Sequence, residues 1–266
     1  MSVAVTILGC GSSGGVPRVG QGWGACDPKE PRNRRRRCSI LIESLAAGAA
    51  PTRVLIDTSP DLREQLLDAD ARYLDAVVLT HDHADHTHGL DDLRPLTILE
   101  RRRIDVYAHE ETARSMASRF DYCFRTPEGG SYPPILNLHE APLHGAFSIE
   151  GRGGTVAFTT FPVIHGDMNV LALKFNNCVY TPDVSRISDD VVDHLRGLDV
   201  WILDALRPTP HPTHFSLAEA LDWIERMQPK RAILTNLHTD LDYRRLRDQL
   251  PAHIEPAYDG MRLTLA

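Results

Sequence analysis

Short apolar runs rich in Val, Ile and Thr recur along the whole chain, and most are bounded by Gly, Pro, Asp or Asn. β-branched residues favour the pleated surface of a sheet, and the bounding residues are typical of turns. The pattern therefore predicts a series of β-strands. The runs cover residues 3–8, 39–43, 53–57, 76–80, 104–108, 155–161, 170–175, 179–181, 200–203, 232–235 and 262–265.

Amphipathic patterns between these runs predict helices. The best marked helix covers residues 217–227, because Ser216 and Glu219 form a capping-box pattern ahead of regularly spaced apolar residues. A second helix is expected over residues 90–103, where Pro95 should delay its start or kink it. Further helices are predicted over residues 61–69, 110–120, 188–196 and 242–250.

The order of these elements favours one fold class. Strands in the first half of the chain pair like hairpins, whereas later strands alternate with helices. This order fits a layered α/β fold with mixed sheets better than a doubly wound parallel sheet. No linker or short repeat divides the chain, so we expect one domain over residues 1–266. Residues 9–31 predict a long Gly- and Pro-rich loop of the kind that is often functional.

Composition excludes several classes of protein. The sequence is 42% hydrophobic and 24% charged, which is typical of a soluble globular protein with a sizeable core. No apolar run reaches the roughly 20 residues of a membrane helix, and the N-terminus resembles a strand rather than a signal peptide. Five dispersed cysteines without a CxxC pair favour a reducing cytoplasm. The net charge of −7 argues against a general nucleic-acid binder.

One loop concentrates residues that bind metals. His81, His83, Asp85 and His86 lie within six consecutive positions after an apolar run. His81 and His83 share one side of an extended chain, while the adjacent Asp85 and His86 must diverge. The loop thus offers two ligand pairs directed at two nearby points, and imidazole with carboxylate suits zinc, manganese or iron. A solvated polar loop is the alternative interpretation.

Two metal ions need more ligands than this loop supplies. His165, Asp183 and His238 each lie just past an apolar run, where a sheet delivers side chains to one edge. Each residue alone fits an ordinary surface or core position, but together they complete a ligand set. Asn236 directly follows its strand, and the i, i+2 spacing is expected to return His238 to the same face.

The motif H-x-H-x-D-H, followed in order by these three residues, resembles the metallo-β-lactamase superfamily over the whole chain. The resemblance implies an αββα sandwich, with two mixed sheets flanked by helices and a dinuclear site at one edge. It implies two divalent ions per chain, zinc or manganese. By the same resemblance one ion is held by His81, His83 and His165, the other by Asp85, His86 and His238, and Asp183 bridges them.

Three further segments resemble the phosphodiesterases of phosphonate degradation, which hydrolyse 5-phosphoribosyl 1,2-cyclic phosphate. They are residues 15–17 with Trp23-Gly24 beyond them, residues 213–216, and residues 258–261. The resemblance implies hydrolysis of a small anionic phosphodiester by a hydroxide that bridges the two metal ions.

Several side chains receive roles in this reaction. His214 is the candidate general acid, because it precedes a well-capped helix, and Asp85 is assigned to the catalytic group with it. Asp57 and Asp204 end strands and are either orienting partners of ligand histidines or loop carboxylates. A homodimer is left open. The remaining histidines show no ligand spacing and are interpreted as bystanders: His88, His109, His139, His144, His194, His211 and His253.

Two other features have more than one interpretation. The basic cluster Arg32, Arg34, Arg35, Arg36 and Arg37 could bind substrate phosphate, although a solvated loop is the simpler interpretation. The characterised phosphodiesterase carries a cysteine cluster for an extra structural zinc near its Trp-Gly. Here that region keeps only Cys26, with Cys38 nearby, so we expect no such zinc site.

Rival functions share the same metal site. A tRNA 3′-processing endonuclease of the superfamily would carry a basic arm that grips tRNA, and the sequence has no such insertion. A lactone or thioester hydrolase stays open, because the metal site alone does not select the substrate. A scaffold without enzymatic activity is disfavoured by the complete set of seven ligands.

Overall fold

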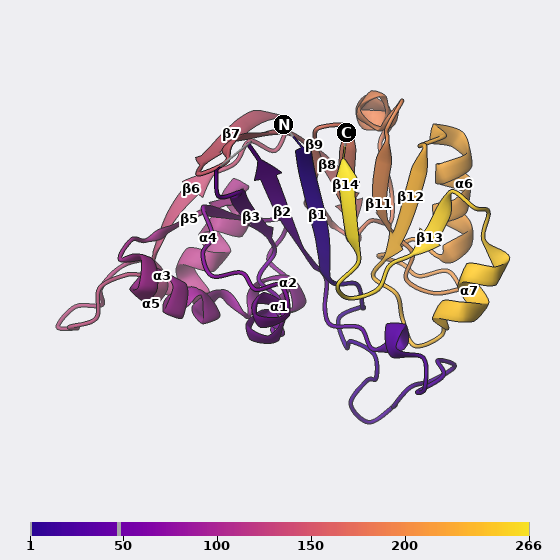
Figure 1. The fold of residues 1–266 in the computed structure, drawn as a ribbon, viewed down its shortest axis with the longest axis horizontal. Coiled ribbons are helices and arrows are strands. Elements are labelled where there is room, and N and C mark those ends of the chain that lie inside the picture. Colours follow the sequence, from indigo (N-terminus) through magenta and orange to yellow (C-terminus); the bar gives the residue numbers. More distant parts are fainter. Residues whose placement is uncertain (1, 47–48, 266) are drawn as a thin grey trace.

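The computed structural model describes residues 2–46 and 49–265, and two seven-stranded sheets form the centre of the molecule (Figure 1). The first sheet has the order β14 (Arg262–Leu265), β1 (Ser2–Gly9), β2 (Ser39–Leu45), β3 (Thr52–Ile56), β4 (Ala76–Leu79), β5 (Ile104–Ala108) and β6 (Leu136–Glu140). The second has the order β13 (Ile254–Pro256), β12 (Arg231–Thr235), β11 (Val200–Asp204), β10 (Cys178–Thr181), β9 (Met168–Phe175), β8 (Gly154–His165) and β7 (Gly145–Gly151).

Both sheets are mixed. β3, β4, β5 and β6 run parallel to one another, as do β10, β11, β12 and β13, whereas the remaining pairs are antiparallel. The helices are α1 (Leu62–Asp68), α2 (Ala84–Thr87), α3 (Arg94–Glu100), α4 (Glu110–Arg119), α5 (Asp121–Phe124), α6 (Leu217–Met227) and α7 (Tyr243–Gln249), with short 3-10 helices η1 (Pro31–Asn33), η2 (Leu90–Leu93) and η3 (Asp189–Leu195). Within the described ranges, no helix has the length and apolar character to cross a membrane.

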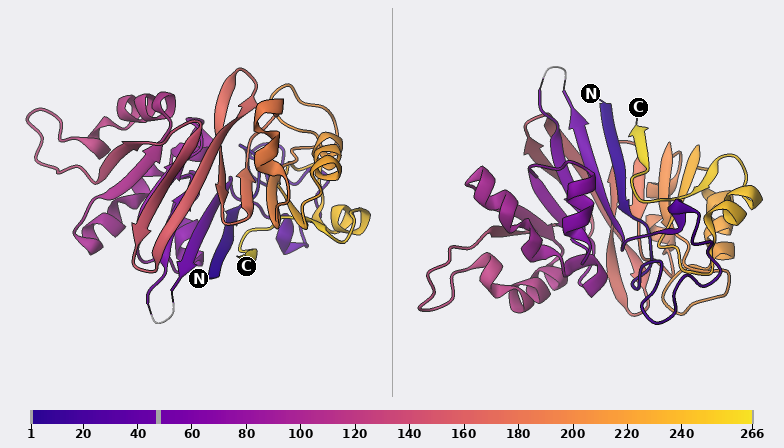
Figure 2. Two further views of the ribbon diagram at one scale, coloured as in Figure 1. Left: turned by 90° about the horizontal axis from the view of Figure 1, so that it is seen from above. Right: turned by 60° about the horizontal axis from the view of Figure 1, so that its bottom comes forward.

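Alternation of side chains along the strands separates the molecule into layers. Ile40 of β2 and Ile202 of β11 belong to one apolar cluster between the sheets. The neighbouring Leu41 points the other way and joins the cluster that includes Leu62 of α1, while Trp201 joins Ile224 of α6. Helices α1 to α5 and helices α6 and α7 therefore cover opposite outer faces (Figures 1 and 2). The predicted αββα sandwich is confirmed.

The capping and proline signals also hold. Helix α6 begins after Ser216, whose hydroxyl accepts a hydrogen bond from the Glu219 amide at 3.3 Å, while the Glu219 carboxylate accepts one from the Ser216 amide at 2.8 Å. The predicted helix 90–103 divides into η2 and α3, and Pro95 lies in the first turn of α3, where its missing N–H leaves no bond unmade. The predicted helix 188–196 is the 3-10 helix η3.

The structure adds strands that hydrophobic patterning did not predict. β6 and β7 lie at the ends of the two sheets and carry several exposed side chains, so they lack a continuous apolar run. β13 has only three residues. The predicted strand 155–161 is longer than expected, because β8 continues to His165.

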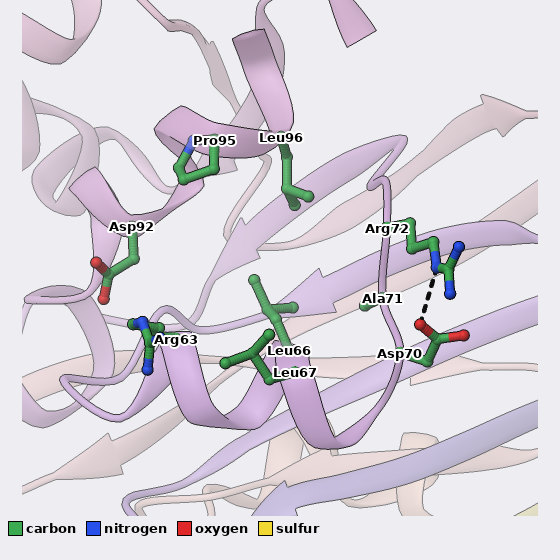
Figure 3. A pocket seen from close by; sticks show the side chains of 9 residues that line it. All are labelled: Arg63, Leu66, Leu67, Asp70, Ala71, Arg72, Asp92, Pro95 and Leu96. Atoms are coloured by element: carbon green, nitrogen blue, oxygen red, sulfur yellow. Dashed lines mark hydrogen bonds and ion pairs between the residues drawn. The ribbon is translucent and has the colours of Figure 1, made fainter. Parts of the chain in front are cut away.

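An open apolar groove of 360 Å³ lies between α1 and α3 (Figure 3). Leu66 and Leu67 of α1 face Pro95 and Leu96 of α3 across it. None of the predicted metal ligands lines this groove, so it is a surface feature separate from the site below.

We expect Ser216→Ala to destabilise the fold by about 1 kcal/mol, because it leaves the Glu219 amide without its cap. Chemical denaturation followed by circular dichroism measures this change. Ser188→Ala is the matched control, because Ser188 precedes η3 without a side-chain cap bond and should change stability by under about 0.5 kcal/mol. Equal losses in both variants would contradict the assigned cap.

Candidate metal centre

The candidate centre lies where strand ends of the two sheets meet. β4 ends just before His81 and His83, and the short helix α2 follows with Asp85 and His86. In the second sheet β8 ends on His165, and Asp183 lies two residues past β10. A hydrogen bond of 2.9 Å from the Leu171 amide to the Thr80 carbonyl ties the sheets together here.

Three histidines and one carboxylate form a compact group. The ligand atoms of His81, His83, His165 and Asp183 all lie within 4.8 Å of one another. Nε2 of His81 is 3.8 Å from Asp183 Oδ2, and Nε2 of His165 is 3.7 Å from the same oxygen. Such spacing leaves room for a cation at the centre of the four donors.

The second oxygen of Asp183 faces a different pair of donors. Asp183 Oδ1 is 3.2 Å from Nε2 of His86, and the same nitrogen is 3.5 Å from Asp85 Oδ2. One buried carboxylate thus presents one oxygen to each donor group. The role of Asp183 as a bridging ligand was implied only by the resemblance and stays a prediction.

Hydrogen bonds fix the imidazoles so that Nε2 faces the centre. The Nδ1 atoms of His86 and His81 lie 2.8 Å from Asp57 Oδ2 and 3.0 Å from the Thr80 hydroxyl. Nδ1 of His165 lies 2.5 Å from the Thr213 carbonyl, which can only accept. Donation from Nδ1 leaves an Nε2 lone pair on each ring directed inward.

The donor atoms lack other partners. Nε2 of His81 and Nε2 of His86 are buried and make no hydrogen bond within the described part of the chain. A buried nitrogen without a partner is costly, and a metal ion would satisfy it. The residues present therefore fit a metal centre.

Electrostatics supports the same conclusion. Burial lowers the pKa of His81 well below its usual value and also lowers that of His165, which keeps both imidazoles neutral as ligands require. Burial opposes charge on His86, but the carboxylates of Asp183 and Asp57 outweigh it and raise its pKa well above the usual value. The carboxylates thus stabilise positive charge here, and the His86 ring would have to lose its second proton to bind a metal ion.

Asp57 performs the predicted orienting role. Its fully buried carboxylate accepts hydrogen bonds from His86 Nδ1 and, at 2.8 Å and 2.9 Å, from the Thr80 amide and hydroxyl. Its φ of 63° is left-handed, a conformation that aspartate adopts more readily than most residues. A strained residue held by several bonds is typical of functional sites.

His214 lies beside the group, where the sequence placed it. Its Nδ1 is 2.8 Å from the buried carboxylate of Asp204, and its ring centroid is 4.4 Å from that of His165. Burial opposes charge on His214, but Asp204 raises its pKa to about 9. Asp204 therefore orients His214 rather than a ligand histidine, which refines its predicted role.

His238 is not brought to the centre. Its Nε2 contacts an Arg18 guanidinium nitrogen, and its Nδ1 lies 3.0 Å from Asp240 Oδ2. Asn236 lies there instead, with its amide nitrogen 3.2 Å from Asp183 Oδ1. The role of His238 as the last ligand therefore stays a prediction, because in this structure its ring is held by other contacts. The i, i+2 argument assumed extended backbone, but Asn236 has a left-handed φ of 60° that turns the chain.

The group opens on one side into a cavity with aromatic and charged side chains in its wall. His83 lines an open cavity of 710 Å³ together with His88, Arg119 and Phe120. The ring centroids of His88 and Phe120 are 5.8 Å apart. His88 was expected to be a bystander, and only the fold places it in the wall of a cavity next to the centre.

Two arginines of the basic cluster are paired with carboxylates, and a third is buried. Arg36 pairs with Asp259 at 3.0 Å, and Arg37 pairs with Asp61 at 3.0 Å. Arg35 is buried and donates to the Leu241 carbonyl at 2.7 Å. These contacts favour a structural role for the cluster.

The two cysteines considered for a structural zinc lie in different surroundings. Cys26 Sγ donates to the Thr239 carbonyl at 3.4 Å, whereas Cys38 Sγ lies 3.6 Å from the Thr235 hydroxyl. Absence of a structural zinc stays a prediction.

Comparison with known proteins agrees with the fold. A family described as "Beta-lactamase superfamily domain" matches residues 52–236. A solved structure described as a new diphosphatase from the PhnP family is 37% identical, with a TM-score of 0.87 over 100% of this chain and 98% of that one. Zn²⁺-bound PqqB from Methylobacterium extorquens is 18% identical, with a TM-score of 0.73 over 98% and 99% of the two chains.

A curated relative, an octanoyltransferase of Porphyromonas gingivalis, is 34% identical over 96% of this chain. The chain spans only 50% of that protein's length. The family match, the 37% identical neighbour and the His/Asp group together support a metal-dependent hydrolase. The chain belongs to the metallo-β-lactamase superfamily, with a fold like that of the PhnP proteins.

Proposed function

We propose that this protein is a metal-dependent phosphodiesterase that hydrolyses a small anionic, cyclic phosphodiester such as 5-phosphoribosyl 1,2-cyclic phosphate. One observation carries the proposal: the two oxygens of Asp183 face two separate groups of inward-directed donors. Two cations held by a shared carboxylate are suited to a displacement at phosphorus. The similarity to a PhnP-family protein supports the phosphate chemistry.

The two proposed metal sites differ in their donors. His81, His83 and His165 with one oxygen of Asp183 make a nitrogen-rich site of the kind that suits zinc. The second site combines His86 with carboxylate oxygens of Asp85 and Asp183, and the Asn236 side chain lies against it. Its oxygen content suits a harder ion such as manganese. His238 is left out of this proposed set.

When bound, the two ions would activate water and stabilise negative charge on the phosphate oxygens. The side chains of the protein would orient the ligands and supply protons. Asp57 and Thr80 hold the ligand histidines in one tautomer, so no reorganisation is needed during the reaction.

The leaving oxygen needs a proton when its bond to phosphorus breaks. His214 uses Nδ1 to bind Asp204, so its Nε2–H is left for that oxygen. The side chain is 15% exposed, which fits contact with a bound substrate. Water supplies the new oxygen on phosphorus and gives one proton to solvent. After His214 has given its proton to the leaving oxygen, the imidazole takes up a proton from solvent to complete the cycle.

Hydrolysis of a diphosphate is a second candidate. The 37% identical neighbour is described as a diphosphatase, and the same centre would stabilise the charge of a leaving phosphate. A tRNA 3′-processing activity or a lactone or thioester hydrolase stays as an alternative on the same site. Cytoplasmic location and a homodimer also stay predictions.

A substrate panel tests the proposed function. Metal-loaded protein should hydrolyse 5-phosphoribosyl 1,2-cyclic phosphate faster than a nucleoside diphosphate, a lactone, a thioester or precursor tRNA. Liberated phosphate ester, measured by chromatography, gives the rate for each phosphate compound. Faster turnover of a diphosphate would replace the first candidate by the second, and turnover of only a lactone, thioester or tRNA would refute both.

Asp183→Ala should reduce occupancy of both metal sites, because Asp183 is the only shared ligand proposed. His165→Ala should empty mainly one site. Elemental analysis of protein purified without chelator should give about two ions for the wild type, about one for His165→Ala and under one for Asp183→Ala. Loss of a single ion in both variants would remove Asp183 from the bridging role.

His238→Ala should retain about two metal ions per chain, because both ring nitrogens of His238 bind other side chains. The matched variant His86→Ala should lose one. The same elemental analysis measures both proteins, with circular dichroism as the control for folding. Loss of one equivalent from His238→Ala would restore the ligand assignment made from sequence.

His214→Ala should lower the rate by about 10²–10⁴-fold on a ribosyl phosphodiester and much less on bis(p-nitrophenyl) phosphate. A ribose oxygen leaves poorly without a proton, whereas nitrophenolate does not need one. Both rates are measured at equal metal content. Equal losses on the two substrates would leave His214 as a structural or substrate-positioning residue.

A further inference from the structure

We propose that Arg18 and Arg207 form an anion subsite beside the metal centre, which binds a second phosphate group of the substrate. This proposal rests on the proposed function and concerns how the protein recognises the part of the substrate that is not cleaved. His238 contacts both Arg18 and Asp240, and its ring is therefore fixed apart from the four-residue donor group.

His238 holds the side chain of Arg18 in place. Burial and the positive charges of Arg18 and Arg207 outweigh Asp240 and lower the pKa of His238. The neutral ring donates from Nδ1 to Asp240 and accepts from Arg18 at Nε2. Arg18 also lies against the loop backbone, because a Cβ atom on Gly14 would be only 2.3 Å from its Nε. The guanidinium is therefore oriented from two sides.

Arg207 is anchored in a similar way. Its guanidinium donates to the carbonyls of Thr209 at 3.3 Å and Pro210 at 2.9 Å. These bonds fix the side chain within the segment that leads to His214 without neutralising its charge.

The backbone brings both arginines close to the centre. The His238 amide donates to the Leu206 carbonyl at 2.9 Å, and the Leu206 amide donates to the Phe215 carbonyl at 2.9 Å. Arg207 follows Leu206, and His214 precedes Phe215, so His238, Arg207 and His214 lie on adjoining segments. Burial, His214 and the positive charge of Arg207 together lower the pKa of His211. The ring centroid of His211 is 5.2 Å from that of His214.

Both arginines lack a carboxylate partner. Within residues 2–46 and 49–265, neither Arg18 nor Arg207 has a carboxylate oxygen within 4.0 Å, in contrast to Arg36 and Arg37. Both side chains are partly exposed. In a chain with a net charge of −7, two oriented and unneutralised guanidiniums next to the proposed reaction centre form a local site for an anion.

The chemistry of the ligand follows from these donors. Guanidinium groups form paired hydrogen bonds with phosphate oxygens, and a dianionic phosphate monoester matches two such cations. The preferred substrate would thus carry a phosphate monoester in addition to the phosphodiester that is cleaved.

A matched pair of substrates tests the subsite: 5-phosphoribosyl 1,2-cyclic phosphate and ribosyl 1,2-cyclic phosphate, which differ only in the second phosphate. With metal-loaded wild-type protein, the phosphorylated compound should have the lower KM. Arg18→Gln should raise its KM by about 10- to 100-fold and leave the KM of the unphosphorylated compound nearly unchanged. Arg18→Lys should recover part of the difference, because it restores the charge.

Two control variants separate this site from its neighbours. Arg34→Gln removes an exposed arginine of the same loop and should leave both KM values unchanged. Arg119→Gln removes the cation from the cavity next to His83. If Arg119→Gln, and not Arg18→Gln, abolished the preference, the second phosphate would bind in that cavity and the inference would be wrong. Equal effects of Arg18→Gln on both substrates would also overturn it.

Calorimetry keeps this test independent of the proposed function. If the wild type hydrolysed neither cyclic phosphate, the proposed function would fail, but binding of ribose 5-phosphate to the metal-loaded protein would still report on the subsite. The wild type should bind ribose 5-phosphate more tightly than Arg18→Gln by about 10-fold or more. Equal affinities would refute the subsite without any turnover.

Discussion

The rest of this candidate centre depends on the contacts between the buried carboxylate of Asp183 and the histidines around it. Asp183 is only 2% exposed, and each of its carboxylate oxygens faces a different set of donors. A buried carboxylate is costly unless positive charge or hydrogen-bond donors surround it. The histidines reach it from both sheets, so the αββα packing and the formation of the centre depend on each other.

The sequence predicts best those residues of the candidate centre that lie close together along the chain. His81, His83, Asp85 and His86 lie in one loop, where spacing alone indicates their directions. The more distant ligands required the rule that strand ends meet at one edge of a sheet. The fold also followed from patterning where strands were buried, whereas β6 and β7 were missed because their exposed positions interrupt the apolar pattern.

The position of His238 depends on the backbone conformation at Asn236. Alternation of side chains holds only while the backbone stays extended, and the left-handed residue Asn236 interrupts it. No pattern of residue types predicts that turn with certainty, although asparagine is one of the few residues that adopt it readily. The pairing of Asp204 with His214, and of His238 with Arg18, likewise required the spatial arrangement of segments far apart in the chain.

The arginines near the N-terminal loop and the proposed centre differ in the partners that they contact. Arg36 and Arg37 are neutralised by carboxylates and hold the N-terminal loop, whereas Arg18 and Arg207 keep their charge near the centre. From sequence alone the run of arginines could bind phosphate, although a solvated loop was the simpler interpretation. The charged partners of a guanidinium determine how strongly it can attract an anion.

Anomalous diffraction from crystals of the metal-loaded protein would test the central claim most directly. The account predicts two peaks on either side of Asp183, one enclosed by His81, His83 and His165 and the other next to Asp85 and His86. No peak should lie at His238. A single peak, or two peaks that do not share Asp183, would contradict the account.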